Sequence, residues 1–383
     1  MNIDREYTIR TLADMIRIDS TNPSLTPGSA GEADMAAYVS DALKKLNLEV
    51  HTHEHEPGRF SVVGIRRSQG SGRSIMLNAH MDTVGVEGLA DPFTAVIRDG
   101  RIYGRGAQDM KGSLAACMGA VKALHDAGTP VAGDVLIAAV ADEEYASMGT
   151  ADIAKRYPVA AAIVTEPTDL DLCLAHKGFV WLEVETQGRA AHGSRFEEGV
   201  DANMHMGRVL AALAALGQDL RTRGGHPLTG PPSLHLSTIQ GGTEWSVYSD
   251  QCILRIERRT APGETVPQAV AEIQAILDRL KAEDPTFIAT LKIIFSREPF
   301  EVSPSCDLVH ALETSSTQVL GRKPKHVGSA GWMDSALLSV EDVETVIIGP
   351  TGDGLHTQEE WVDLDSVVTL ADILARTVVA YCG

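Results

Sequence analysis

The sequence lacks several features that mark large classes of protein. No apolar run in the 383 residues reaches membrane-spanning length, and the charged stretch Met1–Arg10 lacks the apolar core of a signal peptide. The five cysteines are scattered and form no CxxC pair, a pattern typical of reduced thiols that argues against a disulfide framework or a zinc ribbon. We therefore expect a cytoplasmic protein that does not enter a membrane.

Basic residues are in the minority, with 33 Lys and Arg against 52 Asp and Glu and a formal net charge of −19. Because phosphate binding needs a basic surface, we expect no nucleic-acid partner. Part of the acid excess is available to serve as metal ligands. The remaining composition, with 44% hydrophobic residues, is that of an ordinary globular protein long enough for two or three domains.

Apolar runs alternate with helical patterns in the first half of the chain, which predicts a mostly parallel α/β sheet covered by helices on both faces. Helices are expected at 5–18, 31–46, 112–127 and 149–157, and strands at 61–65, 75–77, 135–140 and 160–164. Residues 51–56, His-Thr-His-Glu-His-Glu, place three histidines on one face of a strand. We interpret this stretch as a solvated strand face and not as a metal site.

From Phe179 the pattern changes to β-α-β-β-α-β, the order of a ferredoxin-like α+β unit. Its expected strands are 179–187, 234–240, 251–259 and 287–295, with helices at 199–217 and 266–282. The first pattern then resumes with a helix near 306–320, a strand at 343–348 and a helix from about Asp365. We predict a catalytic α/β domain over 1–177 and 297–383, interrupted by a smaller domain over 178–296.

A glycine-rich stretch, Gly104–Gly112, places the carboxylate of Asp109 in a tight turn between a strand and a helix. By itself such an Asp usually caps a helix or closes a turn. Other metal-capable side chains follow predicted strands or lie in a late glycine loop: His80, Glu144, Glu166 and His356. Because sites gather beyond the carboxyl ends of parallel strands, we expect these residues to meet Asp109.

Mixed histidine and carboxylate ligands suit Zn²⁺, with Co²⁺ and Mn²⁺ as alternatives. Five ligands, one of them bridging, would give each of two ions three protein ligands and an open position. Asp82, two residues after His80, is placed to orient that imidazole. Glu143 diverges from its neighbour Glu144 at a strand end, which leaves it free to act as a general base.

These motifs together resemble the co-catalytic zinc peptidase family that contains acetylornithine deacetylase, succinyl-diaminopimelate desuccinylase, aminoacylase and glutamate carboxypeptidase. The matching stretches are His80-Met-Asp82-Thr-Val, Gly104–Gly112, Asp142-Glu143-Glu144 with Ser147 and Gly149, Thr165-Glu166-Pro-Thr, and His356 before Glu360-Trp361-Val362. The resemblance covers essentially the whole chain. It implies that Asp109 bridges two ions, with His80 and Glu166 on one ion and Glu144 and His356 on the other.

The resemblance also implies that the inserted domain is a lid or dimerisation domain, so we expect a homodimer. In Ala191-His192-Gly193-Ser194, His192 matches a histidine that helps to stabilise the oxyanion. Arg259 matches an arginine that binds a substrate carboxylate. After Gly241-Gly242-Thr243, however, Glu244–Ser249 stands where many relatives carry a substrate-contacting asparagine. Trp245 and Tyr248 in this segment either line an aromatic surface or pack within the domain, so the substrate stays open.

The sequence thus predicts a two-metal hydrolase that cleaves a C–N amide bond of a small substrate. We expect an N-acyl amino acid, as for acetylornithine deacetylase, with metal-activated water and Glu143 as general base. The alternatives are a dipeptidase or carboxypeptidase, or a hydrolase of another C–N bond such as that of an aryl amine. A mononuclear metal deaminase and an inactive binding relative without metal are more remote alternatives.

Overall fold

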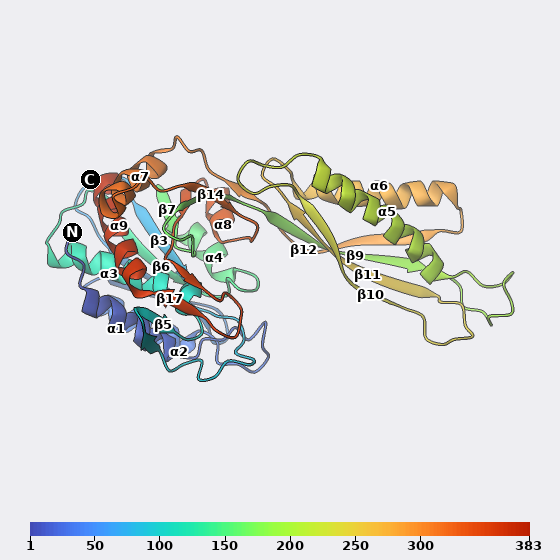
Figure 1. The fold of residues 1–383 in the computed structure, drawn as a ribbon, viewed down its shortest axis with the longest axis horizontal. Coiled ribbons are helices and arrows are strands. Elements are labelled where there is room, and N and C mark those ends of the chain that lie inside the picture. The colour runs from blue at the N-terminus through green and yellow to red at the C-terminus, as the bar shows by residue number, and fades with distance from the viewer. The chain divides into compact units, whose positions relative to one another are not determined.

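The computed structural model describes residues 1–383 and divides them into two units (Figure 1). The first unit contains Met1–Leu174, Val302–Val327 and Met333–Gly383. The second, which we call the inserted unit, contains Ala175–Glu301 and Gly328–Trp332. Both chain termini therefore belong to the first unit.

The larger sheet has nine strands in the order β1-β2-β6-β3-β7-β15-β8-β13, in which β14 also pairs with β8. It lies in the first unit apart from β13 and the last two residues of β8 and of β14. Its strands are β1 (Glu49–Glu56), β2 (Arg59–Arg66), β3 (Ile75–His80), β6 (Val135–Val140), β7 (Ala161–Val164), β8 (Leu172–His176), β13 (Phe300–Glu301), β14 (His326–Ser329) and β15 (Glu344–Ile347). The centre, β6-β3-β7-β15, is parallel, whereas β1, β2, β8 and β13 join it in antiparallel pairs. The expected α/β class with a largely parallel sheet is confirmed.

Every residue of β3, β6 and β7 is buried. Both faces of the sheet centre are therefore covered, as expected for parallel strands flanked by helices. The helices are α1 (Arg5–Ile16), α2 (Ala33–Lys45), α3 (Gly112–Asp126), α4 (Met148–Arg156), α7 (Asp307–Leu320), α8 (Ser335–Val340) and α9 (Leu364–Cys382). One group is formed by α1, α3, α7 and α9, which pack on one another, and α4 packs on α8 (Figure 1). No helix of the chain combines the length and apolarity that a membrane crossing requires.

A second, four-stranded sheet in the first unit joins two segments that are far apart in the sequence. Its antiparallel order is β16-β17-β5-β4, with β4 (Val96–Arg98), β5 (Arg101–Tyr103), β16 (Gly352–Asp353) and β17 (Trp361–Asp363). The pairing of Tyr103 with Trp361 holds the start of the 104–112 stretch beside the end of the loop that carries His356. Within the 104–112 stretch, residues Ala107–Lys111 (η1) form an irregular turn before α3.

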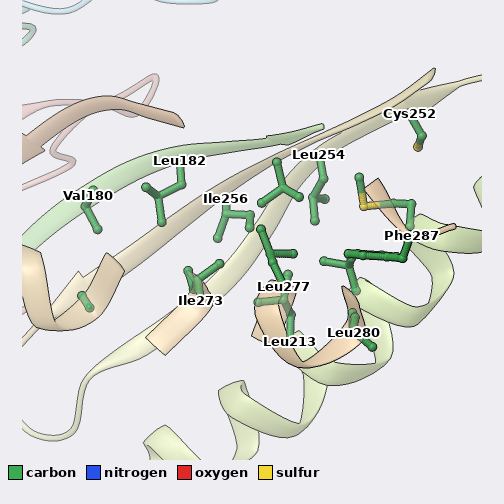
Figure 2. Packing of buried hydrophobic residues seen from close by; sticks show 14 of the residues in the cluster. Val180, Leu182, Leu213, Cys252, Leu254, Ile256, Ile273, Leu277, Leu280 and Phe287 are labelled. Carbon is green, nitrogen blue, oxygen red and sulfur yellow. The ribbon is translucent and has the colours of Figure 1, made fainter. Parts of the chain in front are cut away.

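The inserted unit has the β-α-β-β-α-β order expected from the sequence. Its elements are β9 (Gly178–Gln187), α5 (Ala202–Thr222), β10 (Ser233–Gly241), β11 (Gln251–Thr260), α6 (Val266–Glu283) and β12 (Ile288–Arg297). The antiparallel order β10-β11-β9-β12 is that of a ferredoxin-like sheet. Alternate residues of β9 and β11, among them Leu182 and Leu254, pack against Leu213 and Leu277 of the two helices (Figure 2).

The differences from the expected element bounds have local causes. Helix α5 begins at Ala202, not at 199, because the Asp201 side chain caps it by accepting the N–H groups of Asn203 and Met204. It continues to Thr222, beyond the expected end at 217. The strand expected before Gly104 is β5. The sequence reading missed β8 and α8, and also β4, β13, β14, β16 and β17, which have four residues or fewer.

Candidate metal centre

Chemically active side chains collect at the carboxyl ends of the central parallel strands. His80 is the last residue of β3, Glu166 follows β7, and Glu143 and Glu144 follow β6. Asp109 comes from the turn after β5, and His356 comes from the loop between β16 and β17. Parallel strands end at the same edge of a sheet, so the fold converts separate sequence positions into one cluster.

Three of these side chains form a first group around the buried imidazole of His80. Its Nε2 lies 2.9 Å from Oδ1 of Asp109 and 3.7 Å from Oε1 of Glu166. The three candidate ligand atoms all lie within 4.8 Å of one another. His80 and Glu166 are buried and Asp109 is partly buried, so this group is almost withdrawn from solvent.

A second group shares Asp109 with the first. Nε2 of His356 lies 3.2 Å from Oδ2 of Asp109 and 3.1 Å from Oε2 of Glu144. The two oxygens of Asp109 thus face different groups, Oδ1 toward His80 and Oδ2 toward His356. The side chain of His356 is 53% exposed, so the second group opens to solvent.

Burial raises the pKa of the glutamates in this cluster. The pKa values of Glu143 and Glu166 lie well above the usual range because of burial and then of repulsion by neighbouring carboxylates. Burial raises the pKa of Glu144 to about 7. The raised pKa values show that these carboxylates are crowded together without enough positive charge nearby. A bound metal cation would supply that charge.

The two imidazoles supply part of that charge. Burial alone would raise the pKa of Asp109, but hydrogen bonds from His356 and His80 hold it below its usual range. The same bond to Asp109, with a second to Glu144, raises the pKa of His356 to about 10. Oε1 of Glu144 is buried and has no hydrogen-bond partner. That unpartnered oxygen fits a divalent cation in the second group, and the mixed histidine and carboxylate ligands of both groups suit such a cation.

Residues 76–380 match Peptidase family M20/M25/M40. The chain belongs to this family. The resemblance drawn from the motifs is confirmed, and the protein is a hydrolytic enzyme of a family whose metal chemistry acts on C–N bonds.

Curated relatives of this M20-family chain include a deacetylase and a deformylase. It is 26% identical to an acetylornithine deacetylase of Myxococcus xanthus over 97% of each chain. It is 27% identical to an N-formyl-4-amino-5-aminomethyl-2-methylpyrimidine deformylase of Bacillus subtilis (strain 168), over 93% of this chain and 91% of that one.

Solved structures of the same fold include aminopeptidase PepT of Bacillus cereus, with a TM-score of 0.81 and 17% identity over 100% of both chains. A dinuclear metal binding peptidase of the M20 family from Bacillus subtilis gives a TM-score of 0.76 at 15% identity, over 99% of this chain and 98% of that one.

Asp82 connects two parts of the M20-family site through different atoms. Nδ1 of His80 donates to the backbone carbonyl of Asp82 at 2.9 Å, whereas the nearer carboxylate oxygen lies 3.6 Å away. The imidazole is therefore oriented chiefly by the Asp82 carbonyl, and not by the carboxylate that the sequence reading favoured. The carboxylate instead accepts the backbone N–H groups of Glu143 at 3.1 Å and Glu144 at 3.2 Å.

A buried polar network that the sequence reading missed supports this arrangement. The Asn22 amide donates to Asp82 at 2.8 Å and to Asp142 at 3.1 Å. Arg59 donates to Asp142 at 2.8 Å and holds both oxygens of Glu32, at 2.6 and 2.7 Å. The network therefore holds the Asp142 side chain and, through Asp82, the backbone of Glu143 and Glu144.

Asp334, at the start of α8, is a second residue that the sequence reading missed. Its Oδ2 accepts a hydrogen bond from Thr150, while its Oδ1 is buried without a partner. Burial raises the pKa of Asp334 to about 6. Its negative charge in turn contributes to the raised pKa of Glu143 and of Glu166. No sequence motif of the kind that revealed His80 or Asp109 precedes it.

His192 and Arg259 lie in the inserted unit. Nδ1 of the exposed His192 accepts hydrogen bonds from the hydroxyl and the N–H of Ser194. Nε of Arg259 donates to Glu257 at 2.6 Å, and its guanidinium lies 5.2 Å from the centre of the Phe179 ring. The contacts of both residues in their own unit are thus defined, while their roles toward a substrate stay predictions.

The Glu244–Ser249 segment braces the loop that carries His192. Gly193 donates to the carbonyl of Ser246 at 2.7 Å, and Tyr248 donates to the carbonyl of Ala191 at 3.0 Å. The side chain of Trp245 in the same segment is fully exposed. Trp245 therefore does not pack within the inserted unit, which was one of the two readings of this aromatic residue.

Proposed function

We propose that the protein is a two-metal hydrolase that removes the acyl group from a small N-acyl amino acid. The observation that carries this proposal is the position of Asp109. One carboxylate presents a separate oxygen to each of two histidine–carboxylate groups, 2.9 Å from His80 and 3.2 Å from His356. A carboxylate placed in this way would let the two groups hold a pair of ions that act on one bond.

In this proposal His80, Asp109 and Glu166 would hold one ion, and Asp109, Glu144 and His356 would hold the other. The ligand types favour Zn²⁺, with Co²⁺ and Mn²⁺ as alternatives. When bound, such ions act as Lewis acids toward a carbonyl oxygen and lower the pKa of water.

Glu143 has the position and the environment of a general base. It directly precedes Glu144, and its backbone is held by the Asp82 carboxylate. Its raised pKa suits a group that must take a proton from water and then pass it to the leaving amine. We assign the attack on the amide carbonyl to water that Glu143 deprotonates.

The inserted unit would supply substrate contacts. His192 would donate a hydrogen bond to the developing oxyanion, and Arg259 would pair with a substrate carboxylate. Because Glu257 engages only Nε of Arg259, the terminal guanidinium nitrogens are the groups for this pairing. We also propose that the inserted unit joins two copies of the chain in a homodimer, and that the enzyme works in the cytoplasm.

The two curated relatives support the hydrolytic removal of an acyl group from a small amine. One is named for the removal of an acetyl group and the other for the removal of a formyl group. A second candidate is an amide that carries an aromatic amine. The exposed Trp245, in the segment that braces the His192 loop, favours it.

A substrate panel tests the proposal. Metal-free protein is loaded with Zn²⁺, Co²⁺ or Mn²⁺ in turn and assayed with N-acetyl and N-formyl amino acids, dipeptides and aromatic amides. We expect N-acyl amino acids to give the highest kcat/KM. Faster turnover of dipeptides would assign a peptidase, and turnover of aromatic amides alone would assign the second candidate. Absence of hydrolysis with every metal would refute the proposed function.

A further inference from the structure

Glu360 is a buried carboxylate that belongs to neither histidine–carboxylate group. It lies between the loop that carries His356 and the first residue of β17, and only 2% of it is exposed. A buried carboxylate is costly to fold unless its oxygens are satisfied. Its partners therefore indicate what it is for.

All the side-chain partners of Glu360 are donors from the stretch around Asp109. Oε1 accepts the backbone N–H groups of Gln108 at 2.9 Å and Asp109 at 3.1 Å. Oε2 accepts the backbone N–H of Gly106 at 2.9 Å and Nη1 of Arg105 at 2.7 Å. Backbone N–H groups that converge in this way form an anion-binding nest, and here the anion is a side chain of the same chain.

The shape of the turn explains why it needs an outside acceptor. Gly106 has a φ of 78°, and Asp109 has φ −118° and ψ 92°, which is not helical. Such a backbone cannot direct its N–H groups at carbonyls of a regular helix. The Glu360 carboxylate takes their place and thereby fixes the backbone atoms from which the Asp109 side chain extends.

Arg105 extends the same contact to the second loop. Besides Glu360, its guanidinium donates to the carbonyl of Thr357 at 3.0 Å and to that of Gly85 at 2.9 Å. Thr357 directly follows His356 in the chain. The Arg105–Glu360 pair therefore ties the backbone of Asp109 to the backbone of His356.

We propose that Glu360 is a positioning residue for the bridging carboxylate Asp109. Together with Arg105, it sets the distance between Asp109 and His356 in the group that also contains Glu144. This inference rests on the proposed two-metal function. It adds a role for a residue that touches neither the candidate ions nor the substrate. Without Glu360, Asp109 would keep its carboxylate but lose the orientation that lets one oxygen face each group.

The test is Co²⁺ binding to Glu360→Gln, followed by titration and by the visible absorption of the bound ion. Glutamine nearly matches glutamate in shape, but its NH₂ group would face the donors Gly106 and Arg105 in place of Oε2. The matched control is Glu359→Gln, because Glu359 is adjacent, exposed and paired only loosely with Arg98, at 3.7 Å.

We expect the wild type and Glu359→Gln to bind two Co²⁺ per chain with the same spectrum. For Glu360→Gln we expect roughly 10- to 100-fold weaker binding, as is usual when a supporting partner of a ligand is lost, and an altered spectrum. Unchanged affinity and spectrum in folded Glu360→Gln would overturn the inference. Failure of the wild type to bind two ions would instead refute the proposed metal centre, and the inference with it.

A second variant, Arg105→Lys, tests the same inference by Co²⁺ binding if Glu360→Gln does not fold. Lysine preserves the charge beside Glu360, but its single nitrogen cannot reproduce the fork that reaches Thr357 and Gly85 together. We expect the first Co²⁺ to bind normally and the second to bind at least several-fold more weakly. Two Co²⁺ bound with wild-type affinities in folded Arg105→Lys would contradict the link between the two loops.

Discussion

Arg59 and Arg67 offer a direct comparison of a buried and an exposed ion pair. Each arginine engages both oxygens of one glutamate and one oxygen of an aspartate: Arg59 with Glu32 and Asp142, Arg67 with Glu49 and Asp134. The side chain of Arg59 is 5% exposed and both of its partners are fully buried, whereas Arg67 is 53% exposed. Burial is therefore the main difference between the two.

The expected losses of stability follow from that difference. Arg59→Met leaves two carboxylates buried without their cation, and the free energy of unfolding should fall by about 3–5 kcal/mol. The partners of Arg67 are already in contact with water, so in Arg67→Met they stay solvated and the loss should stay below about 1 kcal/mol. Urea unfolding of both variants and of the wild type measures the two values. Equal losses in the two variants would refute the argument that burial sets the cost.

The loss in Arg59→Met should also depend on pH. Burial raises the pKa of Glu32 even with Arg59 present, so folded Glu32 binds a proton more readily than unfolded Glu32 does. Such a group lowers stability as pH rises through its folded pKa, so the variant should lose less at about pH 5 than at about pH 8. A loss that grows toward acid would contradict this sign.

Three further outcomes are expected. Glu143→Ala should lower kcat by about 10²- to 10⁴-fold, the usual contribution of a general base, with unchanged metal content; near-normal turnover would exclude Glu143 from that role. His192→Ala should lower kcat by roughly 10²-fold and leave Co²⁺ affinity unchanged, and a loss of metal would show that His192 acts otherwise. Leu254→Ala in the inserted core should cost about 2–5 kcal/mol in thermal unfolding, against well under 1 kcal/mol for the more exposed Leu236→Ala, and similar losses would contradict the packing in Figure 2.

Four site residues, His80, Glu143, Glu144 and Glu166, were predictable because a buried apolar strand precedes each of them. Val135–Val140 is apolar throughout and is a fully buried strand, so the acids after it had to lie at a sheet edge. The same reasoning applies to His80 after β3 and Glu166 after β7. Asp109 and His356 lacked such a strand but stood in glycine-rich turns, where the combination with the other motifs revealed them.

The contacts of the supporting residues were not predictable from the sequence, even where those residues stand in a motif, because their partners lie far along the chain. Glu360 and Arg105 are separated by 255 positions, and Arg59 and Asp142 by 83. Nothing local distinguishes Arg59 from Arg67, which stand at the beginning and just past the end of the same strand, β2. Only the packing around each arginine decides which of them is buried.

Asp82 shows a different limit. Its spacing from His80 correctly indicated that the two residues interact, but spacing does not distinguish a side-chain oxygen from a backbone oxygen. In the structure the turn after β3 presents the Asp82 carbonyl to the imidazole and leaves the carboxylate for the N–H groups of Glu143 and Glu144. A motif therefore identifies the partners of an interaction more reliably than the atoms that make it.

The central claim is that one carboxylate, Asp109, serves two metal ions. The most direct measurement is the metal content per chain after equilibrium dialysis against Zn²⁺, compared between the wild type, Asp109→Ala and the exposed-site control Asp353→Ala. The account predicts two ions per chain in the wild type and in Asp353→Ala, and the loss of both ions in Asp109→Ala. One ion retained with wild-type affinity in Asp109→Ala would contradict it.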